Sequence, residues 1–133
     1  MAAALANSIF ANRGIAAVAA SCGVFAADGA DASENAVTVM KEGWNIDISG
    51  HKAKMTDEAN LADAHIVITM TSGHKSHLLA LYPDFAYKIY AVRELGGDGC
   101  DIGDPFGANI EIYQKCAEQI ESFLENFNWE RYL

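Results

Sequence analysis

The sequence predicts an α/β domain of three layers, in which a small parallel sheet is flanked by helices. Short and nearly continuous apolar runs, typical of strands buried on both faces, occupy residues 15–20, 65–70 and 88–92. Helical patterns lie between these runs and after them, and alternating strands and helices favour a parallel sheet. Ligands of such sheets gather at the carboxyl ends of the strands, so we expect the functional site there.

Composition narrows the possible functions. The chain has 133 residues, 51% of them hydrophobic, which fits one globular domain. Nine Lys and Arg against 18 Asp and Glu give a formal charge of −9, which repels nucleic acid and anionic membranes. No apolar run is long enough to span a membrane, and the first residues lack the basic start of a signal peptide. We therefore expect a soluble, cytoplasmic protein without nucleic-acid or membrane partners.

The first half of the chain predicts two helices. Residues 1–12 are rich in Ala and Leu and contain no breaker before Gly14, so they predict a helix without a visible cap. Ser33, followed by an acidic residue, is typical of the start of a second helix, which we expect Gly43 to end. Residues 45–55 are polar and predict an irregular segment.

The second half predicts three more helices. Thr56 and the two acidic residues after it predict a helix start that leads directly into the strand at 65–70. Ser72 is expected to cap the next helix, which ends before Pro83. From Ile110 onward, apolar residues recur at steps of three and four, which indicates a long amphipathic helix at the end of the chain.

The cysteines and histidines predict no metal site. Three cysteines without a Cys-x2-Cys pair argue against a disulfide framework and a four-ligand zinc site, and the four histidines have no zinc spacing. We expect no cofactor. Cys116 on an apolar helix face and Cys22 at a strand end are predicted to be packing thiols, whereas Cys100 in a Gly-rich loop is predicted to be exposed.

The most informative segment is residues 101–107, Asp-Ile-Gly-Asp-Pro-Phe-Gly, which directly precedes the amphipathic helix. Asp104 before a proline is the pattern of an ordinary turn and helix start, and also that of a loop carrying a general acid. A Cys-x5-Arg phosphate loop would need Arg six positions after a cysteine. The residues at those positions are Asp28, Phe106 and Ser122.

In their order and spacing, several segments resemble the low-molecular-weight protein tyrosine phosphatase family over the whole chain. Residues 1–5 resemble the sequence after the family's Ser-Pro, and residues 21–23 resemble its Ser-Ala-Gly strand end. Residues 46–54 resemble its Gly-Ile-x-x-x-x-His-x-Ala-Arg segment. Residues 68–70 resemble its third strand, and residues 104–106 match its acid loop. The resemblance implies that a thiolate in a Cys-x5-Arg loop attacks phosphorus, that loop amides and the Arg hold the phosphoryl oxygens, and that an Asp protonates the leaving group.

The resemblance also assigns roles to residues of this chain. It makes Asp104 the general acid and Phe106 a wall of the substrate pocket. Phe at that position is similar to the bacterial branch that includes protein arginine phosphatases, so the implied partner is a protein carrying phosphotyrosine or phosphoarginine. His51 belongs to a segment that supports the active-site loop. Asp101 is expected to be a solvated loop carboxylate, or else a support for Asp104.

Finally, the resemblance implies that residues 1–133 form one domain that begins after the family's first strand and phosphate loop. Without the nucleophile of that loop, we expect this chain alone to be inactive. In the family the first strand lies inside a sheet of order 2-1-3-4, so we also expect this chain alone to be marginally stable. Three explanations remain open: a start assigned too late for an active phosphatase, a true truncation, or an inactive binding module. An opened sheet would also allow a homodimer.

Overall fold

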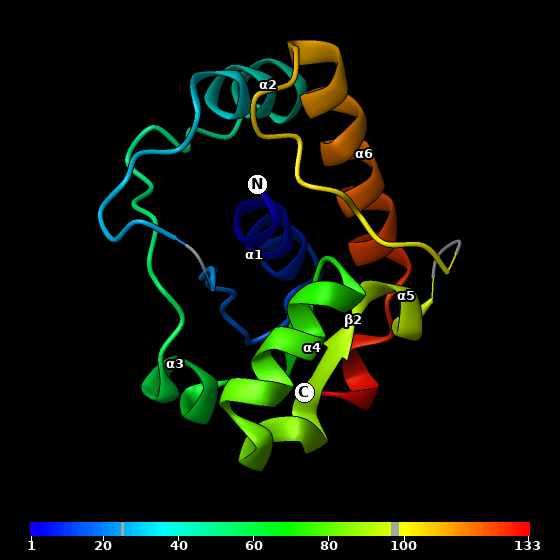
Figure 1. Cartoon of the computed structure of the whole chain (residues 1–133). Helices are drawn as coiled ribbons and strands as arrows, with labels where there is room; N and C mark the ends of the chain where they lie inside the picture. The colour runs from blue at the N-terminus through cyan, green and yellow to red at the C-terminus, as the bar shows by residue number, and fades with distance from the viewer. Residues whose placement is uncertain (25, 97–98) are drawn as a thin grey trace.

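The computed structural model describes residues 1–24, 26–96 and 99–133. Its elements along the chain (Figure 1) are α1 (Ala2–Arg13), α2 (Glu34–Trp44), α3 (Glu58–Asp63), β1 (Val67–Thr69), α4 (Ser72–Leu81), the 3-10 helix η1 (Pro83–Lys88), β2 (Ile89–Ala91), α5 (Val92–Leu95), α6 (Ile110–Asn126) and the 3-10 helix η2 (Trp129–Arg131). The helices at residues 1–12, after Ser33, after Thr56, after Ser72 and from Ile110 are thereby confirmed. No helix of the described chain is both long and apolar enough to cross a membrane.

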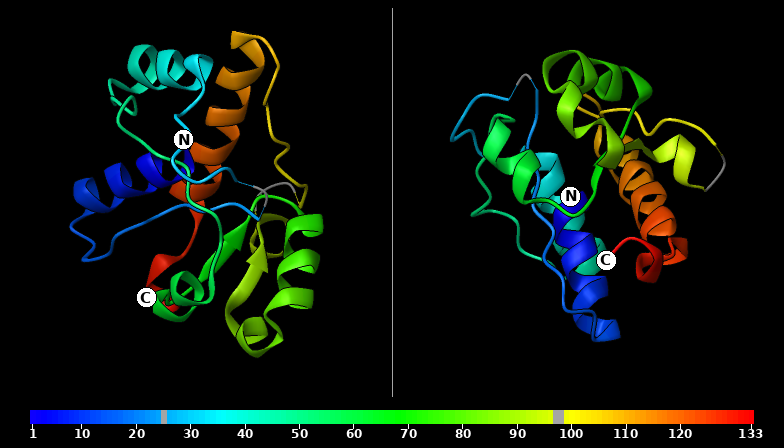
Figure 2. Two further views of the ribbon diagram at one scale, coloured as in Figure 1. Left: turned by 60° about the vertical axis from the view of Figure 1, so that its left-hand side comes forward. Right: turned by 90° about the horizontal axis from the view of Figure 1, so that it is seen from below.

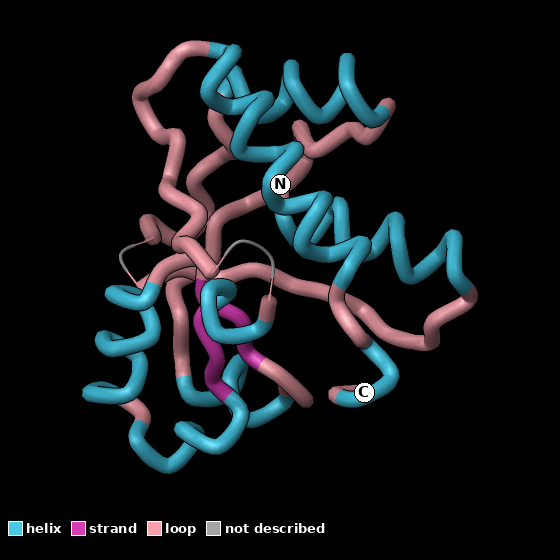
Figure 3. Tube along the Cα trace, turned by 90° about the vertical axis from the view of Figure 1, so that its right-hand side faces the viewer, coloured by secondary structure: helices cyan, strands magenta, loops and turns pink. Residues whose placement is uncertain are grey.

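The sheet has two parallel strands, β1 and β2, which pair from Val67 with Ile89 to Thr69 with Ala91. Figure 3 shows these two short strands side by side. Parallel strands need a crossover, and here α4 and η1 supply it between the end of β1 and the start of β2.

Alternation of side chains along β1 produces the three layers that the sequence predicts. Ile66, Ile68 and Met70 pack against a large core formed mainly by α1, α2 and α6. Val67 points the other way, into a smaller cluster made by residues of α3, α4 and β2. In Figure 2, α1 and α4 accordingly lie on opposite sides of the strands. The prediction of a three-layer α/β fold is confirmed.

The prediction of a strand at residues 15–20 is wrong. These residues are extended and alternate, with Ile15, Ala17 and Ala19 packed against the large core and Val18 88% exposed, but they belong to no strand. Within the described chain, the backbone N–H groups at 16, 18 and 20 have no backbone acceptor. The apolar pattern indicates an extended conformation, whereas a strand also needs a partner for its backbone.

A side chain holds this segment in place. The amide of Asn7 on α1 donates to the Ala19 carbonyl over 2.9 Å, and its oxygen accepts from the Ala19 N–H over 2.7 Å. Asn7 thus satisfies both backbone groups of one residue, as a neighbouring strand would.

Three details of the helices differ from the sequence prediction. Gly43 does not end α2, which continues to Trp44 and is capped by Asn45 with a φ of 54°. Asn tolerates this left-handed conformation better than most residues. The cap of α4 is Thr71 rather than Ser72, because the Thr71 hydroxyl accepts from the N–H of His74. The helix α5 was not predicted, since its four residues are too few for a periodic pattern.

We predict that Asn7→Ala destabilises the protein by about 1–2 kcal/mol, because two half-buried backbone groups lose their partners. Urea unfolding measures the change, and the Ala19 amide should also exchange with solvent much faster. Asn12→Ala is the matched control, since Asn12 lies exposed on the same helix. Equal effects of the two substitutions would contradict this role for Asn7.

Candidate active site

The segment that carries Asp104 lies at the carboxyl end of the sheet. The N–H of Ile102 donates to the carbonyl of Met70, one residue beyond β1, over 2.8 Å. Ile102 is itself buried in the large core, so this bond is shielded from water. The loop of residues 101–107, here called the acid loop, is therefore fixed where ligands of parallel sheets bind.

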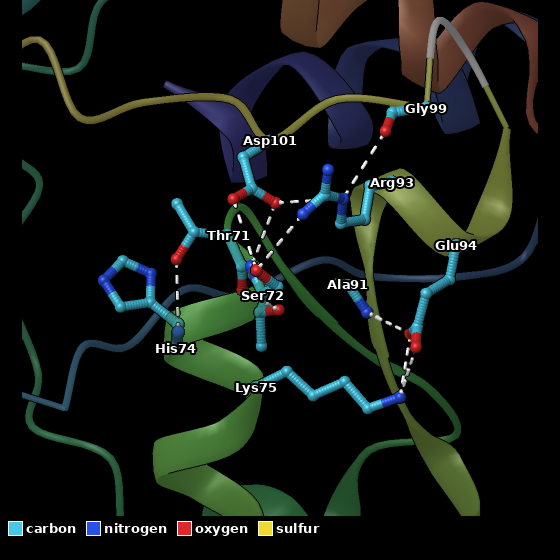
Figure 4. Close-up of polar contacts among 10 residues, drawn as sticks. Thr71, Ser72, His74, Lys75, Ala91, Arg93, Glu94, Gly99 and Asp101 are labelled. Atoms are coloured by element: carbon cyan, nitrogen blue, oxygen red, sulfur yellow. Dashed lines mark hydrogen bonds and ion pairs between the residues drawn. The ribbon is translucent and has the colours of Figure 1, made fainter.

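Asp101 is partly buried and bonded, so it is not a freely solvated carboxylate. It accepts the N–H of Ser72 over 3.0 Å and lies 3.4 Å from the Ser72 hydroxyl. It also forms an ion pair with Arg93, with Nε 3.8 Å from the carboxylate, and its side chain is 34% exposed. Figure 4 shows these three side chains converging at the first turn of α4. The alternative expectation, that Asp101 supports the acid loop, is the one that this geometry favours.

Asp104 is exposed and makes a local turn. Its carboxylate accepts the N–H of Phe106 over 3.0 Å, and the Ala108 N–H then donates to the Pro105 carbonyl over 2.8 Å. Helix α6 begins only at Ile110, with Asn109 as its cap, so Asp104 is not the start of that helix. The carboxyl group is free to face a ligand in solvent.

Below the acid loop lies the buried Cys116 of α6, whose thiol donates to the Gly103 carbonyl over 3.7 Å. Burial raises the pKa of the Cys116 thiol, the negative charge of Asp104 raises it further, and the positive amino group of Met1 opposes them. Burial also lowers the pKa of the Met1 amino group. The Cys116 thiol thus interacts electrostatically with the acid loop on one side and with the start of α1 on the other.

The start of α1 has no side-chain cap. The first N–H groups of a helix have no partner within the helix, and together with the helix dipole they favour negative charge. An uncapped helix end and a carboxyl group that can carry a proton therefore both interact with the Cys116 thiol.

Phe106 lies beside these groups with 81% of its surface exposed. An open hollow of about 300 Å³ separates it from α2 and is lined by Ser33, Glu34, Asn35, Phe106, Gly107, Ala108 and Tyr113. The amide of Asn35 donates to the Ala108 carbonyl over 3.1 Å, which ties α2 to the end of the acid loop. An exposed aromatic ring at the edge of a hollow can contact a substrate side chain.

The structure places His51 in a second hollow, of about 220 Å³, whose lining also includes Ser21, Cys22 and Lys54. Its backbone N–H donates to Ile48, and the ring is exposed. Cys22 is exposed as well and accepts the hydroxyl of Thr56 over 3.2 Å, so the prediction that it is a packing thiol is wrong. Without a strand beside residues 15–22, nothing covers it. The predictions for Cys116 and Cys100 are confirmed.

Two cations at this edge of the sheet are already paired. Arg93 forms an ion pair with Asp101, and the Lys75 amino group forms one with the Glu94 carboxylate over 2.7 Å. The hydrogen bond from Lys75 lowers the pKa of the Glu94 carboxyl group most, and the hydrogen bond from the Ala91 N–H lowers this pKa further. Neither cation is therefore available, without breaking an ion pair, to hold a phosphate. No group of three or more potential metal ligands occurs among the residues that the structure describes.

Sequence reasoning missed Ser72, Arg93 and Asn35 as residues that hold the acid loop. Ser72 carried a partial signal, because a Ser directly after a buried strand and before a helix lies at the ligand-binding edge. Arg93 and Asn35 carried none, since their partners are remote in sequence.

The fold and these groups are those of a three-layer α/β protein with an uncapped helix start and with the acid loop at the carboxyl edge of its sheet. The sequence profile described as low molecular weight phosphotyrosine protein phosphatase matches residues 1–131. The chain belongs to this family. The resemblance inferred from the sequence is confirmed.

Among curated relatives, a protein-arginine-phosphatase of Geobacillus stearothermophilus is 36% identical over 107 residues, which cover 79% of this chain and 70% of that protein. The protein-arginine-phosphatase of Bacillus subtilis is 30% identical over 125 residues, 93% of this chain and 82% of that protein. Among solved structures, the low molecular weight protein tyrosine phosphatase of T. tengcongensis superposes with a TM-score of 0.88 at 38% identity. That match covers 93% of this chain and 84% of the other.

We predict that Cys116 reacts with iodoacetamide at neutral pH more than about tenfold more slowly than Cys22 in the folded protein, because only the thiolate reacts and burial both raises its pKa and blocks access. Peptide mass spectrometry over a time course measures both rates, and unfolding in urea should remove the difference. Equal rates in the folded protein would contradict the position of Cys116 under the acid loop.

Proposed function

We propose that this chain carries the general acid and the scaffold of a phosphoprotein phosphatase that works through a phosphocysteine intermediate. In this proposal Asp104 is the general acid, Phe106 lines the pocket for the phosphorylated side chain, and His51 supports the phosphate loop. One observation carries the proposal: the acid loop is bonded to the carboxyl end of β1, and the Cys116 thiol that contacts this loop also interacts electrostatically with the amino group at the start of α1.

The chemistry follows from that arrangement and from the family. A cysteine thiolate attacks phosphorus, the bond from phosphorus to the leaving group breaks, and Asp104 gives its proton to the leaving atom. Water then attacks the phosphocysteine, Asp104 takes a proton from it, and the thiolate leaves with inorganic phosphate formed. N–H groups at the start of α1 stabilise the negative charge on the phosphoryl oxygens in both steps.

Residues 1–133 do not themselves supply every part. None of the three cysteines is followed by Arg at the required spacing, and Arg93 and Lys75 are held in ion pairs. We therefore expect this segment alone to show no turnover above background. The nucleophile would have to come from a Cys-x5-Arg loop placed at the start of α1.

The backbone hydrogen bonding of the sheet leaves a position for a further strand that would lead into such a loop. Within the described chain, β1 pairs only with β2, and the extended residues 15–22 lack a strand partner. We propose that the strand lies between residues 15–22 and β1, so that residues 1–133 and this strand form one domain. A parallel strand there would end beside α1 and the acid loop.

The test is to fuse the family's strand and Cys-x5-Arg loop, taken from the Geobacillus stearothermophilus relative, ahead of Met1. We expect the fusion to hydrolyse an aryl phosphate and residues 1–133 alone not to do so. Asp104→Asn in the fusion should lower kcat by about 10²–10⁴-fold, because the leaving oxygen then departs without a proton.

The matched control is Asp84→Asn, which changes an exposed carboxylate in η1, distant in sequence from the acid loop, and should leave kcat unchanged. An inactive but folded fusion would contradict the proposal and would favour a phosphatase-like binding module. Its oligomeric state would then decide whether the partner is a second copy of this chain.

Phosphoarginine is the second candidate substrate. Two curated relatives bear the name protein-arginine-phosphatase, and this chain has Phe106 after the Asp-Pro pair. We predict that the active fusion has a higher kcat/KM for a phosphoarginine peptide than for the same peptide with phosphotyrosine. A direct phosphate-release assay measures both, and a preference for phosphotyrosine would assign the chain to the other branch.

A further inference from the structure

We propose that Asp101 is a positioning residue that sets the place of the Asp104 carboxyl group by holding the start of the acid loop on α4 and α5. The inference rests on the proposed function, since it gives Asp101 a task within that reaction. Asp101 and Asp104 stand in one loop but have different surroundings: the first is half-buried and bonded, and the second is exposed.

The start of the loop is held from three directions. The Asp101 carboxylate accepts the Ser72 N–H in the first turn of α4, and it pairs with Arg93 of α5. The neighbouring Ile102 N–H binds the Met70 carbonyl after β1. Arg93 also donates from Nε to the Gly99 carbonyl over 3.4 Å, so one guanidinium contacts the chain both before and at Asp101 (Figure 4).

The far end of the loop has its own anchor. The Ala108 carbonyl accepts a hydrogen bond from the side-chain amide of Asn35 on α2, and the Ala108 N–H donates to the Pro105 carbonyl. Between the two anchors lie residues 103–107, which include Gly103 and Gly107, the latter with a φ of 79°. The backbone between the anchors thus contains two glycines, and the Cys116 thiol contacts it at the Gly103 carbonyl.

Asp104 itself has little else to fix its position. Among the residues that the structure describes, its carboxylate accepts a hydrogen bond from the N–H of Phe106 within the same loop, and the side chain is exposed. The position of the Asp104 carboxyl group therefore depends on where the anchors put the loop. A hydrogen bond from an N–H at a helix start to a charged carboxylate is stronger than a hydrogen bond between neutral groups. Asp101 is therefore a firmer anchor than the neutral pair of Asn35 and Ala108 at the far end of the loop.

Removing the Asp101 carboxylate should let the loop shift without unfolding the sheet, because Ile102 remains buried and bonded. A misplacement of about 1 Å is enough to cost about 100-fold in a positioned proton transfer. The loss should fall on the step that needs a proton from Asp104. It should therefore depend on the leaving group, whereas a general loss of folded enzyme would not.

The experiment compares Asp101→Ala, Asp101→Asn and the control Asp84→Ala in the active fusion, with two aryl phosphates. Phenyl phosphate has a poor leaving group that needs the proton, and 2,4-dinitrophenyl phosphate has a good one that does not. We compare kcat/KM, which reports only the steps up to formation of the phosphocysteine and so omits the later hydrolysis in which Asp104 is the base. We expect Asp101→Ala to lower kcat/KM by about 10–100-fold on the first substrate and by less than about threefold on the second.

Two further variants separate positioning from folding. Asp101→Asn should keep most of the activity, because its amide oxygen can still accept from Ser72. Asp101→Ala combined with Asp104→Asn should be no slower than Asp104→Asn alone, since both act on one proton transfer. Equal losses on both substrates, or additive losses in the double variant, would overturn the proposal.

A readout on residues 1–133 keeps this proposal separate from the proposed function. Asp101→Ala should speed exchange of the Ser72 amide by more than about tenfold and leave core amides of α6 unchanged. If the fusion with native Asp101 is inactive, the proposed function fails, and the exchange rate of the Ser72 amide alone then tests whether Asp101 anchors the loop. An unchanged Ser72 amide would then overturn it.

Discussion

An extended backbone needs hydrogen-bond partners for its N–H and C=O groups, and this requirement shapes the rest of the structure. Residues 15–22 cross the molecule as an extended segment whose N–H groups at 16, 18 and 20 find no backbone acceptor within the described chain. Unpaired backbone groups are tolerated only where water reaches them, which agrees with the high exposure of Val18. The same condition leaves Cys22 exposed and reduces the sheet to two strands.

Despite that small sheet, both ends of the acid loop are held by hydrogen bonds to the rest of the fold. The helices α1, α2 and α6 share one core, where edge-to-face contacts such as Phe10 with Trp129 fix the end of the chain. That core carries Ile102 and Cys116, and through them the acid loop. The position of Asp104 thus rests on helix packing and side-chain anchors more than on strand pairing.

Local patterns were enough to predict most helices and the acid loop. The periodicity of α6 and the Asp57 start of α3 are signals within a few neighbouring residues, and both were confirmed. The strand at 15–20 was predicted wrongly because pairing depends on residues far away in sequence. Asn45 likewise replaced Gly43 as the end of α2, since two residues able to adopt a helix-ending conformation stood close together.

The candidate site shows the same division. Asp104 and Phe106 were identified from a short motif, and their roles remain predictions. The bonds that hold their loop join residues 29 positions apart, Ser72 with Asp101, and 73 apart, Asn35 with Ala108. No pattern along one sequence reports such contacts, because each partner also has an ordinary local explanation as a cap or a turn.

Amide hydrogen exchange of residues 15–22 tests whether a strand position is open beside this segment, when it is measured on residues 1–133 and on the fusion that adds the family's strand and phosphate loop. In the first protein we expect the Val18 amide to exchange nearly as fast as in an unfolded chain. In the second it should be protected by more than about 100-fold, because the added strand pairs with it. Strong protection without the added strand, or none with it, would contradict an open strand position beside this segment.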